Sequence, residues 1–432
     1  MTIRTVTSTV SVLSLAAVAG LVSVISSSAT AQAEEAIENL LLDATPTLNV
    51  RTRYEHVDQD GKSDHANAKT VRTRLGLESG RFHGVGVVFD YEWIESLGSE
   101  RYNSTTNGKT NYPVVADPED DEVNQLYLVA TGTIPNTNLK LGRQRVIWDN
   151  SRFIGNVGFR QNEQTFDAFR GVVTPMKELD FEYLYLDQAN RIFGRDSSNG
   201  RAEMSSHGFR MQYRGWDNMS VTPFALLLDY DKTAQSGSSS ATYGVMLNGK
   251  LPLDNGKTFL YNTAFAYQED YGDNPDDFDA YYLQLEPGIK MGGLTLFGGY
   301  ELLSGDGEAS FQTPLATLHK FNGFTDTFLT TPPDGLQDAY LKVGYKVAGE
   351  AWYSGIKLGA QLHGFWADET SDHYGTEWNL AINKGFSFAL GKLVVGLKYA
   401  SYDAEDYGSD TDKLWLSTQF SLHPRKLRDL SN

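Results

Sequence analysis

The chain has 432 residues, a formal net charge of −18 and no cysteine. This acidity argues against nucleic acid, which is bound by neutralising phosphates with Lys and Arg. The lack of cysteine excludes a fold held by disulfides. The 41 glycines, 23 tyrosines and 22 phenylalanines are typical of a barrel with an apolar outside and a polar inside.

The N-terminus has the three parts of a secretory signal. Arg4 precedes an apolar stretch over residues 10–25, and Ala31-Gln32-Ala33 has the small residues at which a signal peptidase cuts. The alternative, an anchoring helix, is disfavoured because the apolar stretch is short and followed by serines. We therefore expect a signal peptide over residues 1–33, cleaved after Ala33, with Ala31 as the alternative position.

Alternation of apolar and polar residues dominates the chain after residue 45. In the first segment the odd positions hold Asn49, Arg51, Arg53 and Glu55, whereas the even positions are mostly apolar. A period of two is typical of a strand whose faces meet unlike environments. Eighteen segments show it, an even number as in bacterial single-chain barrels: 46–56, 68–80, 82–94, 122–131, 138–148, 164–174, 178–188, 205–214, 218–230, 241–249, 257–270, 278–290, 292–303, 336–347, 353–367, 375–386, 391–402 and 412–421.

The connections between these segments alternate between long and short along the whole chain. Such alternation is typical of barrels with long outer loops and short periplasmic turns. A soluble β-sandwich has no reason to show it, and a propeller would repeat a motif in every blade. The sequence thus predicts a periplasmic N-terminal segment (34–45), an all-β, transmembrane, antiparallel up-and-down barrel (46–421) and a periplasmic C-terminal tail (422–432).

Aromatic residues near the predicted strand ends suit the interfacial girdles of such a barrel. They include Tyr281, Tyr282, Trp366, Trp378 and Trp415. We expect these rings to face the outer-membrane lipid.

With the apolar faces turned outward, the inward faces are rich in basic residues. Lys and Arg along a pore favour anions, and the fork of Arg matches a carboxylate. The alternative is that these arginines pair with acids on adjacent strands and stiffen the lumen, and both interpretations stay open. The inward acids are Glu55, Glu78, Asp90, Glu92, Glu286 and Glu301, and most other acids lie in the predicted outer loops. The inward basic residues are Arg51, Arg53, Arg72, Arg74, Lys140, Arg170, Arg210, Arg214, Lys342, Lys346, Lys357 and Lys398.

Two long segments carry a resemblance to a known family. The first is Leu139-Lys-Leu-Gly-Arg-Gln-Arg145 with residues 148–168, and the second covers residues 311–332. Both resemble the alginate export porin family, and the opening strands at 51–55 and 71–77 look similar to it as well. The resemblance implies a monomeric, eighteen-stranded outer-membrane barrel whose electropositive lumen passes an anionic uronate polymer.

The first motif adds basic residues to the expected pathway. Arg152, Arg160 and Arg170 lie in or beside it, whereas the orientation of Arg143 and Arg145 stays open because they share the parity of outward leucines. The amides of the motif serve either to bind sugar hydroxyls or to pin the loop to the wall. We expect the loop 304–335 to be ordered and folded against the barrel. The predicted substrate pathway comprises Arg51, Arg53, Arg72, Arg74, Arg152, Arg160, Arg170, Arg210, Arg214, Lys342 and Lys346.

Other classes of function fit the sequence less well. An enzyme is not expected, because the chain has no Gly-x-Ser-x-Gly or His-Glu-x-x-His motif. We therefore predict no catalytic residue, cofactor or metal site. A structural or adhesin barrel with a blocked lumen would need apolar inward faces. A general porin for small anions or sugars remains an alternative to the uronate channel, and the direction of transport is not encoded in a passive pore.

Overall fold

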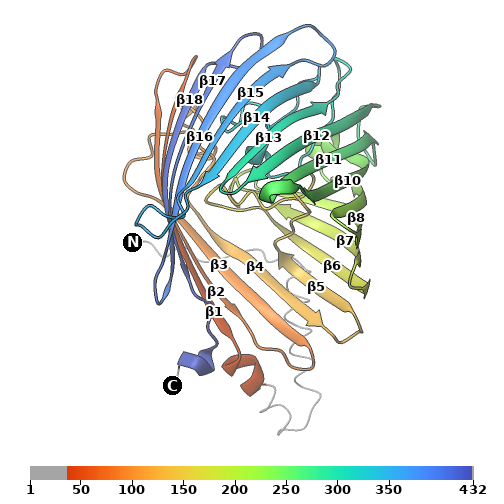
Figure 1. The fold of residues 1–432 in the computed structure, drawn as a ribbon, viewed down its shortest axis with the longest axis vertical. Helices are drawn as coiled ribbons and strands as arrows, with labels where there is room; N and C mark the ends of the chain where they lie inside the picture. The colour runs from red at the N-terminus through yellow and green to blue at the C-terminus, as the bar shows by residue number, and fades with distance from the viewer. Residues whose placement is uncertain (1–36, 431–432) are drawn as a thin grey trace.

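The computed structural model describes residues 37–430, so the predicted signal peptide lies outside the described residues. Eighteen antiparallel strands form one sheet that closes on itself, because β1 (Thr45–Gln59) pairs with both β2 (Ala66–Glu78) and β18 (Thr411–Leu422) (Figure 1). The prediction of an antiparallel eighteen-stranded barrel is confirmed.

Each predicted segment overlaps one strand of the barrel, with ends that differ by a few residues. Four short 3-10 helices are described: η1 (Thr233–Ser238), η2 (Asp254–Gly256), η3 (Leu318–Lys320) and η4 (Leu427–Leu430). Within residues 37–430, no helix is long and apolar enough to cross a membrane. The remaining strands are β3 (Val85–Ser96), β4 (Asp120–Thr131), β5 (Thr137–Gln144), β6 (Thr165–Met176), β7 (Leu179–Asn190), β8 (Arg201–Trp216), β9 (Met219–Leu228), β10 (Ser240–Pro252), β11 (Lys257–Asp270), β12 (Asp279–Met291), β13 (Leu294–Leu303), β14 (Leu336–Lys346), β15 (Lys357–Trp366), β16 (His373–Ser387) and β17 (Gly391–Ala404).

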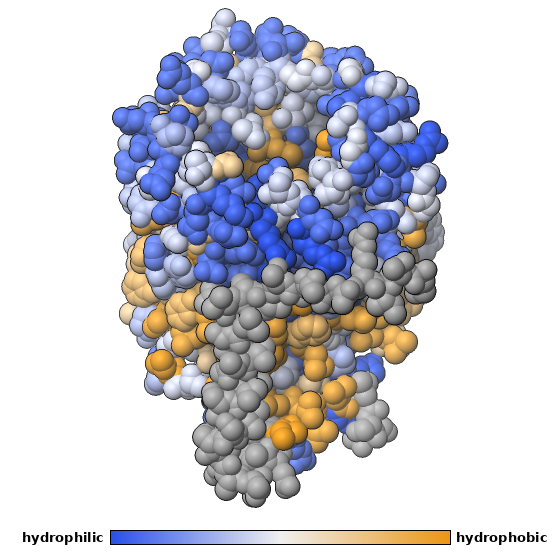
Figure 2. Space-filling model, turned by 180° about the vertical axis from the view of Figure 1, so that it is seen from behind, coloured by the Kyte–Doolittle hydropathy of each residue, from blue (hydrophilic) through white to orange (hydrophobic). Residues whose placement is uncertain are grey.

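The outside of the barrel carries exposed apolar side chains. Figure 2 shows them as a belt in the lower half of the molecule, below a mostly hydrophilic upper half. Of the predicted girdle residues, Trp366 and Trp378 are exposed, and Tyr281 is exposed as well. Tyr282 and Trp415 were predicted wrongly, because both are buried inside the barrel, where Tyr282 packs against Phe153 and Phe311.

Two long loops fold into the lumen. The loop 304–335 is ordered and packs against the wall, as predicted, and Phe311 and Leu315 within it are buried. Together with residues of the loop 145–164, they form one apolar core with inward side chains of the wall such as Leu184 and Leu226. The inward faces of β7 and β9 are therefore partly apolar, unlike the polar lumen that we expected. These side chains are apolar because they pack on loops and not on water.

The two inward loops are joined by hydrogen bonds between their backbones. Gly155 N donates to Leu315 O at 2.9 Å, and Thr317 N donates to Ser151 O at 3.0 Å. Gln164 adds a side-chain hydrogen bond to Leu315 O at 2.9 Å. We call residues 145–164 and 311–328 the loop pair, since these contacts make them one folded unit.

Candidate functional site

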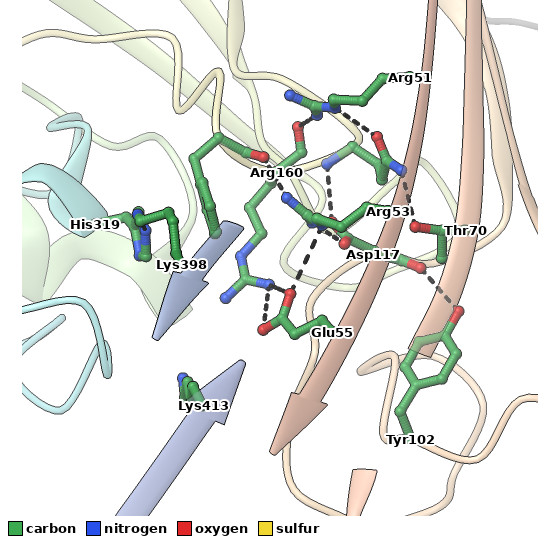
Figure 3. Close-up of polar contacts among 12 residues, drawn as sticks. Arg51, Arg53, Glu55, Thr70, Tyr102, Asp117, Arg160, His319, Lys398 and Lys413 are labelled. Carbon is green, nitrogen blue, oxygen red and sulfur yellow. Dashed lines mark hydrogen bonds and ion pairs between the residues drawn. The ribbon is translucent and has the colours of Figure 1, made fainter. Parts of the chain in front are cut away.

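Arginines of the wall donate to four consecutive carbonyls of the loop pair. Period two turns Arg51, Arg53 and Arg72 inward, where their side chains are buried. Arg51 donates to Arg160 O, and Arg53 donates to Phe159 O (Figure 3). Arg51 also donates to Gly158 O at 2.8 Å, and Arg72 donates to Gln161 O at 3.4 Å. A carbonyl is a neutral acceptor, so these contacts hold the loop without cancelling the charge of the arginines.

Gln161 and Asp117 complete this attachment. The side chain of Gln161 accepts from Arg51 Nε at 2.8 Å and donates to Thr70 Oγ1 at 2.8 Å. Its backbone N–H donates to Asp117 Oδ1 at 2.8 Å, and Asp117 also pairs with Arg53. Of the two interpretations of the amides in this motif, Gln161 follows the pinning of the loop to the wall. Burial alone would raise the pKa of Asp117, but Arg53 and Arg160 hold it below its ordinary value.

Arg160 links the loop pair to the wall by two ion pairs. Its Nη1 lies 3.1 Å from Glu55 Oε2, and its Nη2 lies 2.9 Å from Asp326 Oδ2. Asp326 also contacts His319 Nδ1 at 2.7 Å. Burial by itself would raise the pKa of Asp326, but His319, Lys413 and Arg160 hold it well below its ordinary value.

His319 lies between this carboxylate and a lysine of β17. Its Nε2 is 2.7 Å from Lys398 Nζ, and its ring stacks on Phe159 at 3.5 Å between centroids (Figure 3). An ammonium group only donates, so Nε2 accepts and Nδ1 carries the proton that bonds to Asp326. His319 is therefore neutral, and burial lowers its pKa to about 3. His319 and Asp117 were missed because no period orients loop side chains. Lys413 lies on β18 and was missed because it shares the parity of Trp415, which we expected to face the lipid.

Most of the other predicted pathway residues form ion pairs. Arg74 contacts Glu92 and lies 3.0 Å from Glu163, and Arg152 lies 3.2 Å from Glu301 and is buried. The other pairs are Arg170–Glu182 (2.6 Å), Arg210–Asp149 (2.6 Å), Arg214–Asp180 (2.7 Å) and Lys342–Glu286 (3.1 Å). Lys346, at the end of β14, is exposed.

Arg143 and Arg145, whose orientation the sequence leaves open, have different surroundings. Arg143 is buried against Asp167 of β6, with Nε 2.8 Å from Oδ1. Arg145 pairs with Glu163, and both line a cavity of the lumen. Gly142, at a φ of +121° between the outward leucines and Arg143, is the irregular position that breaks the alternation here.

Two groups of cavities lie on opposite sides of the loop segment 156–164. A cavity of about 630 Å³ at the short-turn end, the inner cavity, is lined by four arginines and three acids. The outer cavity consists of two adjoining spaces of about 430 and 280 Å³ that share Arg160, Ile192, Phe193, Asp326 and Leu329. The charged lining of the inner cavity is Arg51, Arg72, Arg74, Arg145, Glu78, Asp90 and Glu163.

The strand register shows what separates these cavities. On β1 the inner cavity reaches Arg51 and the outer cavity begins at Val57, so Arg53 and Glu55 lie between them. On β18 the inner cavity begins at Gln419 and the outer cavity ends at Lys413. The layer between the cavities, which we call the constriction, contains Arg53, Glu55, Phe159, Arg160, His319, Lys398 and Trp415.

The carboxylates Glu55 and Asp326 are paired with basic side chains: Glu55 with Arg160, and Asp326 with Arg160, Lys413 and His319. Over residues 37–430, no group of three or more His, Asp or Glu side chains is arranged to hold a metal ion.

Comparison with known proteins identifies the fold. No protein-family model and no curated protein matches this chain. OpdO of Pseudomonas aeruginosa is similar at a TM-score of 0.66 and 18% identity, over 89% of this chain and 99% of its own. OpdK of the same organism, solved with vanillate, has a TM-score of 0.68 and 17% identity over the same shares. OccAB2 of Acinetobacter baumannii has a TM-score of 0.67 and 15% identity, again over 89% and 99%. These similarities support the barrel fold.

Proposed function

We propose that this protein is a monomeric outer-membrane porin, a passive channel without catalysis, that conducts anionic solutes. The observation that carries the proposal is the basic excess of the cavities on both sides of the constriction. Four arginines face three acids in the inner cavity, and Arg160 with Lys413 faces Asp326 in the larger outer space. Basic groups along a pore favour anions. The belt of apolar side chains supports a place in lipid, and OpdK is described as an outer membrane protein.

The solute that we favour is a uronate-type, alginate-like oligo- or polysaccharide. The resemblance of the two loop segments to alginate export porins supports this substrate. The inner cavity also offers uncharged polar groups for hydroxyls next to its arginines, among them Asn49, Gln125 and Gln419. A chain of acidic sugars needs both kinds of partner, since each unit carries one carboxylate and several hydroxyls.

A second candidate is a small aromatic or otherwise amphipathic anion. The smaller outer space has an apolar wall that includes Phe193, Leu318 and Leu329, beside the cations Arg160 and Arg191. An apolar wall with a few charged groups is typical of small-molecule sites. OpdK was solved with vanillate, a compound of this kind.

The proposal is tested by ion selectivity in a planar bilayer under a KCl gradient. We expect a reversal potential that favours chloride, block by uronate oligomers and little effect of neutral oligomers of the same length. Stronger competition by vanillate than by a monomeric uronate would favour the second candidate. A preference for potassium would refute the anion channel, and the absence of conductance would favour a structural barrel filled by its loops.

A matched pair of variants locates the effect in the pathway. Arg191→Gln removes a cation of the outer cavity that is half-buried over the ring of Phe193. Lys232→Gln removes an exposed cation that pairs with Glu203 on the outer surface. We expect the first to lower the chloride preference and the second to leave it unchanged. Equal effects of the two variants would mean that the outer cavity is not part of the pathway.

A further inference from the structure

Glu55 occupies the layer that an anion has to cross. It lies on β1 between the two cavities, and its side chain is 1% exposed. Arg160 Nη1 reaches both of its oxygens, at 3.3 Å and 3.1 Å, and Arg53 Nε lies 3.7 Å from Oε2. A carboxylate of the protein thus already sits on the two guanidinium groups at the narrow point.

A passing anion offers the same chemical group. Carboxylates bind guanidinium through charge-assisted hydrogen bonds, whatever molecule they belong to. Removing one partner of a buried ion pair is costly because the other charge is left unpaired. An incoming carboxylate that takes the place of Glu55 on Arg160 avoids this penalty for the guanidinium, and the displaced Glu55 keeps Arg53, 3.7 Å away, as its partner.

The neighbouring acids are held by shorter contacts than Glu55, whose closest partner atom is 3.1 Å away. Asp326 contacts both Arg160 and His319, with Lys413 at 3.8 Å. Asp117 pairs with Arg53 and accepts the backbone N–H of Gln161. Glu55 has hydrogen bonds from Arg160 and a longer contact with Arg53. Of the three carboxylates, Glu55 therefore has the longest contacts, and so the weakest ones, to lose when another anion arrives.

We propose that Glu55 is an exchangeable counter-anion of the constriction, which a translocating carboxylate replaces on Arg160 as it passes, while Glu55 stays paired with Arg53. The inference rests on the proposed anion channel and names the residue that sets its selectivity. The negative charge of Glu55 weakens the attraction of the two arginines for a passing anion, so that the anion enters the constriction and also leaves it. Conduction needs binding that is strong enough for entry and weak enough for exit.

The test compares Glu55→Gln with Glu301→Gln in planar bilayers. Glu301 is a matched control, because it is similarly buried and pairs with Arg152 of the same loop, but does not belong to the constriction between the cavities. We expect Glu55→Gln to raise the chloride-to-potassium permeability ratio about sixteenfold, because the loss of one unit charge about 5 Å from the ion path in water favours chloride about fourfold and disfavours potassium about fourfold. Uronate oligomers should stay bound longer by about fourfold or more, and Glu301→Gln should change neither quantity.

Two further results separate the possible explanations. Glu55→Asp keeps the charge on a shorter side chain, so we expect the wild-type permeability ratio but a longer oligomer dwell time. This variant decides the question if the glutamine variant does not fold. Unchanged dwell times in both Glu55 variants, or equal shifts in Glu301→Gln, would overturn the role of Glu55. A wild-type channel that prefers potassium refutes the proposed function alone, because a shift in Glu55→Gln would still place Glu55 on the ion path.

Discussion

Arg51 shows why guanidinium groups line this wall. A single Arg51 side chain donates to the side chain of Gln161 and to two backbone carbonyls, at Gly158 and Arg160. The five donors of arginine lie in a fixed plane, whereas an ammonium group is a compact point charge. Arg51 forms no ion pair within 4 Å in the part of the chain that the structure describes. It therefore combines a structural attachment with an uncompensated positive charge at the inner cavity.

Glu163 gives the loop pair a dependence on pH. Its carboxylate is buried between Arg74 (3.0 Å) and Arg145 (2.9 Å). Burial alone would raise the pKa of Glu163, but the two arginines hold it well below its ordinary value. A depressed pKa in the folded state stabilises the protein above the unfolded pKa of about 4.3, and the contribution is lost as the pH falls through the folded value.

We therefore expect the free energy of unfolding to decrease below about pH 4, and Glu163→Gln to weaken this dependence. At pH 7 the variant should be less stable by about 3 kcal/mol, because the buried Arg74 keeps only Glu92 as its anion and the half-buried Arg145 loses Glu163. Urea unfolding of the detergent-solubilised barrel between pH 3 and pH 7 measures both effects. The control Glu78→Gln removes an exposed pair with Arg81 and should cost at most about 1 kcal/mol. An unchanged pH profile in Glu163→Gln would contradict this account.

At the scale of elements, Gly155 controls how closely the two inward loops approach. A Cβ atom at this position would lie 2.1 Å from Thr317 Oγ1 and 2.8 Å from Ser151 Cβ. Both contacts are too short, and overpacking of this kind costs about 1–3 kcal/mol. We expect Gly155→Ala to loosen the loop pair while the strands stay paired, because no strand residue is displaced.

Limited trypsin digestion of the folded barrel measures this loosening. Arg152 and Arg160 are buried in the loop pair, so cleavage after them requires local opening. Gly155→Ala should increase the cleavage rate at these sites by about tenfold, because we expect it to lower the free energy of local opening by about 1–2 kcal/mol. Gly237→Ala is the control, since a Cβ there meets no atom within 4 Å. Equal cleavage rates in the two variants would show that the loops are not coupled at Gly155.

The strands were predictable from the sequence, and the interior was not. A period of two fixes which side of β1 and β2 holds Arg51 and Arg72, because the wall separates two unlike environments. Loops have no such period, so the inward fold of residues 145–164 had no signal beyond the family resemblance. The same reason explains Asp117, which lies in an acidic run typical of solvated loops but is buried beside Arg53. The inward position of Leu184 and Leu226 was missed, because alternation along a strand shows that its two faces differ but not whether the lumen is filled with water or with packed side chains.

At the scale of the whole molecule, the barrel closes where its first and last strands meet. The register of β1 with β18 runs from Asn49 opposite Ser421 to Gln59 opposite Thr411. Beyond this seam the C-terminal tail returns to the N-terminal segment (Figure 1). Leu427 N donates to Ala44 O at 2.8 Å, and Asp43 pairs with Lys426 and Arg428. The tail thus fastens the two chain ends across the seam at the short-turn end.

Removing the tail tests whether this fastening closes the barrel. The ion pairs of Asp43 are partly exposed, and such pairs contribute at most about 1 kcal/mol each. We expect a chain that ends at His423 to keep the heat-modifiable electrophoretic mobility of a folded barrel, with a loss of at most about 2 kcal/mol in urea unfolding.

Deletion from Ser417 onward supplies the contrast. It removes half of the register with β1 and leaves strand edges unpaired, a state that lipid does not tolerate. We expect this chain to lose the heat-modifiable mobility completely. If the shorter deletion already abolishes it, the barrel depends on the tail for closure, and the hydrogen bonds between β1 and β18 are not sufficient. If both chains fold, closure does not require the half of the seam at the short-turn end, from Ser417 to Ser421. We therefore expect the tail to be dispensable and the end of β18 to be essential. The eleven paired positions between β1 and β18 contribute more to closure than the few exposed contacts of the tail.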